Sequence, residues 1–113
     1  MSSQINSIME SFGNKIRSFR ESKGLLLRQV ASVIEIDQAL LSKIERCERS
    51  ATRNQVLAIA RLYEMEENEL LSLWMGEKIA HELKDEVFAN DALKVAEKTI
   101  EYLNNPQSQI AHV

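Results

Sequence analysis

Cysteine, proline, glycine and aromatic residues are all scarce in this sequence of 113 residues. The single cysteine, Cys47, excludes an internal disulfide framework and a cysteine-rich zinc site, and is typical of proteins from a reducing cytosol. Three glycines and one proline leave few breaks in regular structure. Aromatic residues are too few for the stacking surfaces of single-strand nucleic-acid binders.

Long apolar segments and catalytic signatures are also missing. No segment approaches the ~18 apolar residues of a membrane span. The first twelve residues, MSSQINSIMESF, lack the basic start and apolar stretch of a signal peptide. There is no Gly-rich phosphate loop, nucleophile elbow or recognisable acid pair. We therefore expect a cytoplasmic protein with no membrane contact, no enzymatic activity and no cofactor.

Charge is distributed unevenly along the chain, although the net charge is -3. Residues 12–53 hold nine Lys or Arg against five Asp or Glu, whereas residues 54–113 hold five against eleven. Such asymmetry suggests that one half faces an anion and the other half faces elsewhere. The alternative is the ordinary scatter of charge in helical proteins.

Apolar residues recur at helical spacing almost throughout, which predicts an all-α fold. Gly24 is expected to end the first helix, Asp37 to cap the third, and Thr52 with Gln55 to form a capping box before the fourth. The five apolar faces expected up to Trp74 are Phe12, Ile16 and Phe19; Leu27, Val30, Ala31 and Ile34; Leu40, Leu41 and Ile44; Val56, Leu57, Ala60 and Tyr63; and the segment 69–74.

Beyond Trp74 the apolar pattern changes, and one or two further helices are expected. One runs through Ile79 and Leu83 to about Ala89, and the last is capped by Asn90 or Asp91. The predicted organisation is therefore a five-helix domain over residues 12–74, a helical extension over 75–104, and flexible tails over 1–11 and 105–113.

Only Glu35, Ile36 and Asp37 separate the second and third helices, which is the arrangement of a helix-turn-helix. FGNKIRSFRESKGL, QVASVIEIDQALLSKIERCERS and TRNQVLAIARLYEMEENELL together resemble the helix-turn-helix family of phage-repressor and Cro type, often called XRE. The resemblance covers residues 12–71, and SKIERCER is its most specific segment. It implies a five-helix, repressor-like DNA-binding domain whose partner is the major groove of double-stranded DNA.

The resemblance places base readout on the first turns of the third helix, at Gln38, Ala39, Ser42 and Lys43. These positions face away from the core if residues 40, 41 and 44 are buried. Gln can pair with adenine, Lys can donate to guanine, and Ala can lie against a thymine methyl group. The alternative is that these side chains are merely solvated, and we favour readout, with Gln38 and Lys43 as the main readers.

The resemblance also implies contacts to phosphate and one structural ion pair. Arg20 and Glu45 match positions that in some family members join the first and third helices. The family's Thr-Gln at the start of the second helix is replaced by Leu26-Leu27, leucines that could instead cover the core or a subunit contact. Each arginine taken singly could equally be a surface residue. The predicted phosphate contacts are Arg28, Gln29, Arg46, Arg49 and Arg53, of which Gln29 is the weakest candidate.

Cys47 and the acidic residues around His81 each have a structural and a functional interpretation. Cys47 replaces the glycine that usually ends the third helix; it is either a tolerated loop residue, which we favour, or a redox sensor. Glu77, His81 and Asp85 are spaced four apart on one helix, but such spacing is common and we expect no metal site.

The last two helices need a cover for their apolar faces: they either fold back or pair with a second copy. We favour a homodimer, because a two-fold dimer reads two half-sites about one helical turn (~34 Å) apart. The expected function is a transcriptional regulator on a palindromic operator, either an autoregulating repressor or a restriction–modification controller, with a possible toxin or polymerase contact. The alternatives are an antitoxin and a protein-interaction module that does not bind DNA. The residues expected to form the dimer are Leu83, Val87, Leu93, Ala96, Ile100 and Leu103.

Overall fold

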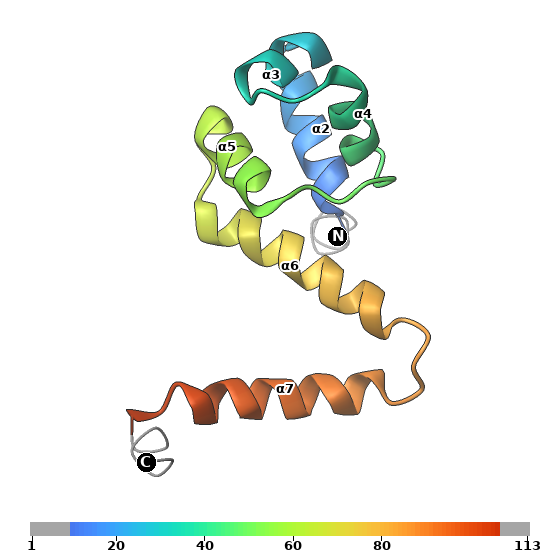
Figure 1. Ribbon diagram of the computed structural model, residues 1–113, viewed down its shortest axis with the longest axis vertical. Helices are drawn as coiled ribbons and strands as arrows, with labels where there is room; N and C mark the ends of the chain where they lie inside the picture. Colours follow the sequence, from blue (N-terminus) through green and yellow to red (C-terminus); the bar gives the residue numbers. More distant parts are fainter. Residues whose placement is uncertain (1–9, 107–113) are drawn as a thin grey trace, which may run out of the picture. The chain divides into compact units, whose positions relative to one another are not determined.

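The computed structural model describes residues 10–106 and confirms an all-α fold there. Its elements are α2 (Phe12–Ser22), α3 (Leu27–Val33), α4 (Gln38–Glu45), α5 (Arg53–Tyr63), α6 (Glu67–Leu83) and α7 (Ala89–Leu103) (Figure 1). The tails expected over 1–11 and 105–113 lie almost entirely outside the described residues.

Short polar side chains begin three of the helices. Ser11 Oγ accepts a first-turn N–H of α2 at 3.0 Å. Asp37 accepts a first-turn N–H of α4, as predicted. Thr52 and Gln55 form the predicted capping box of α5, since the side chain of each accepts the backbone N–H of the other, at 3.2 and 2.9 Å. These bonds satisfy N–H groups that a helix leaves unpaired at its start.

Four helices end at a residue with left-handed backbone. Gly24 (φ +67°) follows α2 as predicted, whereas Glu35, Cys47 and Glu64 (φ 60°, 64° and 54°) follow α3, α4 and α5. At each end the next N–H bonds back to the carbonyl five residues earlier, the Schellman arrangement. The Cβ of a residue other than glycine is crowded in this conformation, so each of the three non-glycine ends costs about 1 kcal/mol.

One apolar core lies between α2, α3, α4, α5 and the first part of α6. Trp74 of α6 is buried at its edge, and its indole Nε1–H donates to the Ala51 carbonyl at 2.8 Å. Met75, the next residue, is exposed. The most deeply buried large side chains are Ile16, Val30, Leu41, Ile44, Val56, Ile59 and Leu70.

The helices after Tyr63 differ from the prediction. The expected break after Trp74 is wrong, because α6 continues without interruption to Leu83. The change in apolar pattern at that point marks where the helix leaves the core, since Gly76 is helical and a Cβ there would meet nothing within 4 Å. The predicted continuation to Ala89 is also wrong, because residues 84–88 are not helical and α7 begins at Ala89.

The chain divides into two compact units, one up to Lys78 and one from Ile79. In the second unit no side chain of α7 is buried. Of the six residues predicted to pair subunits, Leu83 is half-buried and the other five are exposed. Within residues 10–106, none of the helices has both the length and the apolar character needed to cross a membrane.

Candidate nucleic-acid interface

α3 and α4 form the predicted helix-turn-helix, joined by residues 34–37. α4 packs against both α3 and α2 (Figure 1). Leu41 and Ile44 of α4 are completely buried, and Leu40 is partly buried against the same core. The rotation of α4 about its axis is therefore fixed by its apolar residues, and positions 38, 39 and 43 face solvent.

The solvent-facing side of α4 carries the predicted readers. Gln38, Ala39 and Lys43 are exposed, and Ser42 is half-buried. The single acid of the helix, Glu45, is buried. The exposed side of α4 thus presents amide, methyl, hydroxyl and ammonium groups but no carboxylate of its own. Such a surface can approach a polyanion without repulsion from the helix itself.

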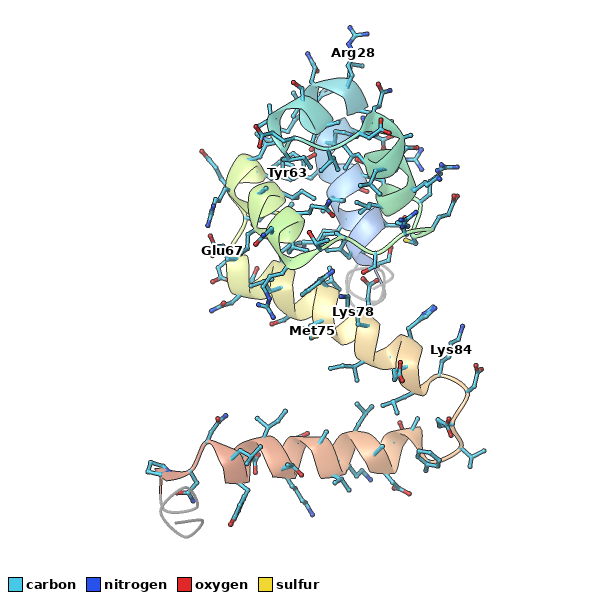
Figure 2. All side chains as sticks on the ribbon, in the orientation of Figure 1. Arg28, Tyr63, Glu67, Met75, Lys78 and Lys84 are labelled. Carbon is cyan, nitrogen blue, oxygen red and sulfur yellow. The ribbon has the colours of Figure 1, made fainter. Side chains whose placement is uncertain are left out.

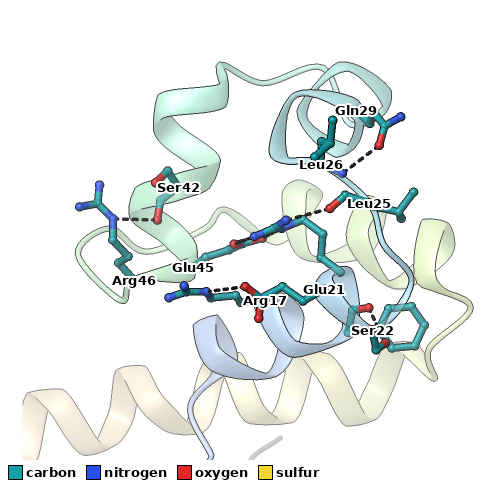
Figure 3. A network of polar contacts seen from close by, with 11 residues as sticks. Arg17, Glu21, Ser22, Leu25, Leu26, Gln29, Ser42, Glu45 and Arg46 are labelled. Atoms are coloured by element: carbon teal, nitrogen blue, oxygen red, sulfur yellow. Dashed lines mark hydrogen bonds and ion pairs between the residues drawn. The ribbon is translucent and has the colours of Figure 1, made fainter.

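Arg20 of α2 neutralises Glu45, so the structure brings together the two residues predicted as an ion pair. Arg20 Nε and Nη2 donate to the two carboxylate oxygens at 2.8 and 3.0 Å, and Nη1 donates to the Leu25 carbonyl at 2.8 Å (Figure 3). The two side chains are only 11% and 3% exposed. The hydrogen bond to Glu45 raises the pKa of Arg20, so the guanidinium stays charged. The pair ties α4 to α2.

Tyr63 of α5 lies in the core behind this pair. Its ring centroid is 4.7 Å from that of Phe19, and the side chain is buried. Burial raises the pKa of Tyr63 to about 12, and the negative charge of Glu45 adds to the rise. The folded protein therefore keeps this phenol neutral at pH values where a solvated tyrosine ionises.

Gly13 brings α2 and α4 into direct backbone contact. A Cβ at this position would lie 2.5 Å from the Ile44 carbonyl oxygen, 2.7 Å from that of Glu45 and 2.9 Å from Cys47 Sγ. Only glycine fits here without displacing the end of α4. Gly13 was not among the predicted positions, although an isolated glycine inside a helical pattern can have a packing reason.

Arg28 is exposed at the start of α3 and projects away from it (Figure 2). The Gln29 side chain caps the start of α3, because its Oε1 accepts the Leu26 N–H at 2.8 Å (Figure 3). The residue as a whole is exposed. Leu26 and Leu27 were expected either to cover the core or to form a subunit contact. Leu27 packs against the core, whereas Leu26 is exposed.

The three arginines that follow the readers are all exposed, in different settings. Arg46 donates from Nε to the Ser42 carbonyl at 3.3 Å and pairs with Glu48 at 3.2 Å. Arg49 lies in the loop before α5. Arg53, in the first turn of α5, lies over the Trp74 ring, 5.7 Å from its centroid. A phosphate would thus compete with Glu48 for Arg46 and with the indole for Arg53.

Cys47 occupies the left-handed position after α4. It is exposed, and its Sγ lies 3.2 Å from Ser11 Oγ. The backbone bond from the Cys47 N–H to the Ile44 carbonyl closes the end of α4 at 3.1 Å. The Cys47 side chain therefore contacts the residue that caps the start of α2, from its own position at the end of α4.

Glu77 has a structural role. Both of its carboxylate oxygens accept the Phe12 N–H at 3.0 Å, so a residue of α6 caps the start of α2. Across residues 10–106 there is no group of three or more His, Cys, Asp or Glu side chains placed to hold a metal ion, Glu77, His81 and Asp85 included.

A family model described as a helix-turn-helix domain matches residues 11–73, which is more than half of the chain. No curated protein and no solved structure matches it. The matched residues contain α2, α3, α4 and α5 entirely, together with residues 67–73 of α6, among which Leu70 is buried. All of the predicted readers and phosphate contacts fall within them.

Proposed function

Because the chain belongs to the helix-turn-helix domain family, whose domain indicates binding to DNA, we propose that it is a transcriptional regulator that reads a specific duplex sequence with α4. The observation that carries this proposal is the exposed face of α4. It holds Gln38 and Lys43 and no carboxylate, because the only acid of the helix, Glu45, is buried. The ion pair of Arg20 and Glu45 makes the helix a rigid reader, since it fixes α4 against α2.

In the proposed complex α4 lies in the major groove. Gln38 pairs with adenine, Lys43 donates to guanine, Ala39 meets a thymine methyl group and Ser42 bonds to a neighbouring base edge. Arg28, Gln29, Arg46, Arg49 and Arg53 are the proposed phosphate contacts, which hold the register without reading sequence. Arg46 exchanges Glu48 for a phosphate at little cost, because exposed ion pairs contribute about 0–1 kcal/mol.

Within the family we propose the phage-repressor and Cro type, supported by the SKIERCER segment. We propose further that two copies bind a palindromic operator and repress transcription, because a dimer seated across the groove obstructs polymerase. The exposed apolar side chains of α7 support the dimer. The function assigned is binding, with no catalytic step.

The test is selection of bound sequences from random duplex DNA, followed by fluorescence anisotropy on the selected site. Affinity should fall steeply with salt, with a slope of about -0.9 per phosphate neutralised. The triple variant Arg28→Ala, Arg46→Ala, Arg49→Ala should lose about three units of that slope and weaken binding to all sequences alike.

The double variant Gln38→Ala, Lys43→Ala should lose sequence preference, at about 1–3 kcal/mol for each base contact, and keep residual non-specific binding. Lys98→Ala on α7 is the matched control, because it removes one positive charge outside the helix-turn-helix domain of residues 11–73 and should leave affinity unchanged. If the double variant keeps the full sequence preference, α4 is not the reader. If the wild type binds duplex DNA no more tightly than the triple arginine variant, these arginines do not contact phosphate and the protein-interaction module is the better assignment.

A further inference from the structure

α7 has an apolar face made of small and large residues in alternation. Ala89, Leu93, Ala96 and Ile100 follow one another at spacings of four, three and four, the pattern of a coiled-coil seam. Leu93 and Ile100 are 44% and 58% exposed. No side chain of this 15-residue helix is buried, and a helix of that length on its own is only marginally stable in water. Another helix is therefore needed to cover this face.

The alternation of small and large seam residues along α7 fits a second copy of the same helix that runs in the opposite direction. In a parallel pair each seam residue meets its own copy, so a layer of two leucines would be followed by a layer of two alanines. In an antiparallel pair Ala89 meets Ile100 of the second copy, and Leu93 meets Ala96 of the second copy. Every layer then holds one small and one large side chain, which gives the even packing that protein interiors require.

The polar residues beside the seam agree with this register. It places Glu97 next to Asn90 of the second copy, an amide that can donate to the carboxylate, and Ala92 next to Thr99 of the second copy. Moving the register by one heptad, so that Leu93 meets Leu103 of the second copy, would set the two Glu97 side chains against each other. Antiparallel helices also place opposite ends of their macrodipoles side by side.

We propose that α7 pairs with α7 of a second copy in antiparallel orientation, with the two-fold axis between residues 94 and 95. This inference rests on the homodimer of the proposed function but not on its DNA contacts. It names the orientation and the register of the subunit interface. Val87, which is 104% exposed, and Phe88 lie just before α7 and extend its apolar surface.

Disulfide crosslinking tests the register in a Cys47→Ser background, which contains no other thiol. Ala89→Cys and Ile100→Cys are purified separately, mixed under reducing conditions and then oxidised with copper phenanthroline. The mixture should give a dimer band in which peptide mapping links position 89 to position 100. Each variant oxidised alone should stay monomeric on a non-reducing gel. Lys98→Cys, on the opposite side of α7, should give no dimer in either case.

Self-linked Ala89→Cys would overturn the antiparallel orientation in favour of a parallel pair. A dimer of the wild type in sedimentation equilibrium without the expected crosslink would place the interface elsewhere, and a monomer at tens of micromolar would overturn pairing altogether. Circular dichroism of each variant verifies that it is folded. If the crosslink forms but the wild type does not bind duplex DNA, the subunit pairing holds and the DNA-binding function fails.

Discussion

Replacing Gly13 by alanine should destabilise the protein by pushing apart α2 and α4. The added Cβ would lie 2.5 Å from the Ile44 carbonyl oxygen, while ordinary contact begins at 3.4 Å. One backbone must therefore move by about 0.9 Å relative to the other. Because two of the three close atoms are backbone oxygens, no flexible side chain can absorb this shift.

The expected magnitude follows from two opposing effects. Overpacking a close contact costs about 1–3 kcal/mol, whereas alanine gains up to about 1 kcal/mol over glycine within a helix. The free energy of unfolding should fall by about 1–2 kcal/mol, which corresponds to roughly 4–8 °C in Tm for a chain of this size. The variant should also bind the selected DNA more weakly, because the displaced helix is the proposed reader.

Urea denaturation followed by circular dichroism measures the first effect, and anisotropy measures the second. Gly76→Ala is the matched control, since Gly76 is also helical but a Cβ there meets nothing within 4 Å. It should stabilise the protein by up to about 1 kcal/mol. If Gly13→Ala proves as stable as Gly76→Ala, the proposed backbone contact between α2 and α4 does not exist.

Two further predictions concern the buried polar residues. The pKa of Tyr63 is about 12 in the folded chain and 10 in the unfolded one, so between these pH values the folded state holds the extra proton and stability falls as pH rises. Urea midpoints should show that the wild type loses roughly 2–3 kcal/mol more than Tyr63→Phe between pH 9 and 12; equal losses would refute the assignment. Glu45→Ala leaves the Arg20 guanidinium buried and unpaired and should cost about 3–5 kcal/mol in the same assay, while Arg20→Met with Glu45→Leu should recover most of this. A double variant as unstable as the single one would contradict that reasoning.

Most of the first unit follows from short-range signals in the sequence. Asp37, Thr52 and Gln55 are cap residues whose bonds lie within one helical turn, so their positions predict where α4 and α5 begin. Gly24 marks the end of α2 in the same way. Buried positions in α4 follow from its apolar spacing, which in turn predicts the exposed face.

Features that depend on distant parts of the chain could not be predicted in this way. Glu77 caps α2 from 65 residues further along the chain, and no local pattern distinguishes it from other helical glutamates. The contact of Gly13 likewise exists only once α2 and α4 meet. α6 was divided wrongly because its apolar pattern reports burial, and a helix that leaves the core changes its pattern without ending.

Trp74 gives the protein an internal fluorescent reporter. It is the only tryptophan, its indole N–H is bonded to Ala51 before α5, and the cationic groups of Arg53 and Lys78 lie 5.7 and 4.0 Å from its ring centroid. Its emission therefore senses a single location where the loop after α4, the first turn of α5 and α6 meet. Arg53 is both a neighbour of this indole and a proposed phosphate contact. Binding of DNA would therefore change the Trp74 fluorescence of the unlabelled protein.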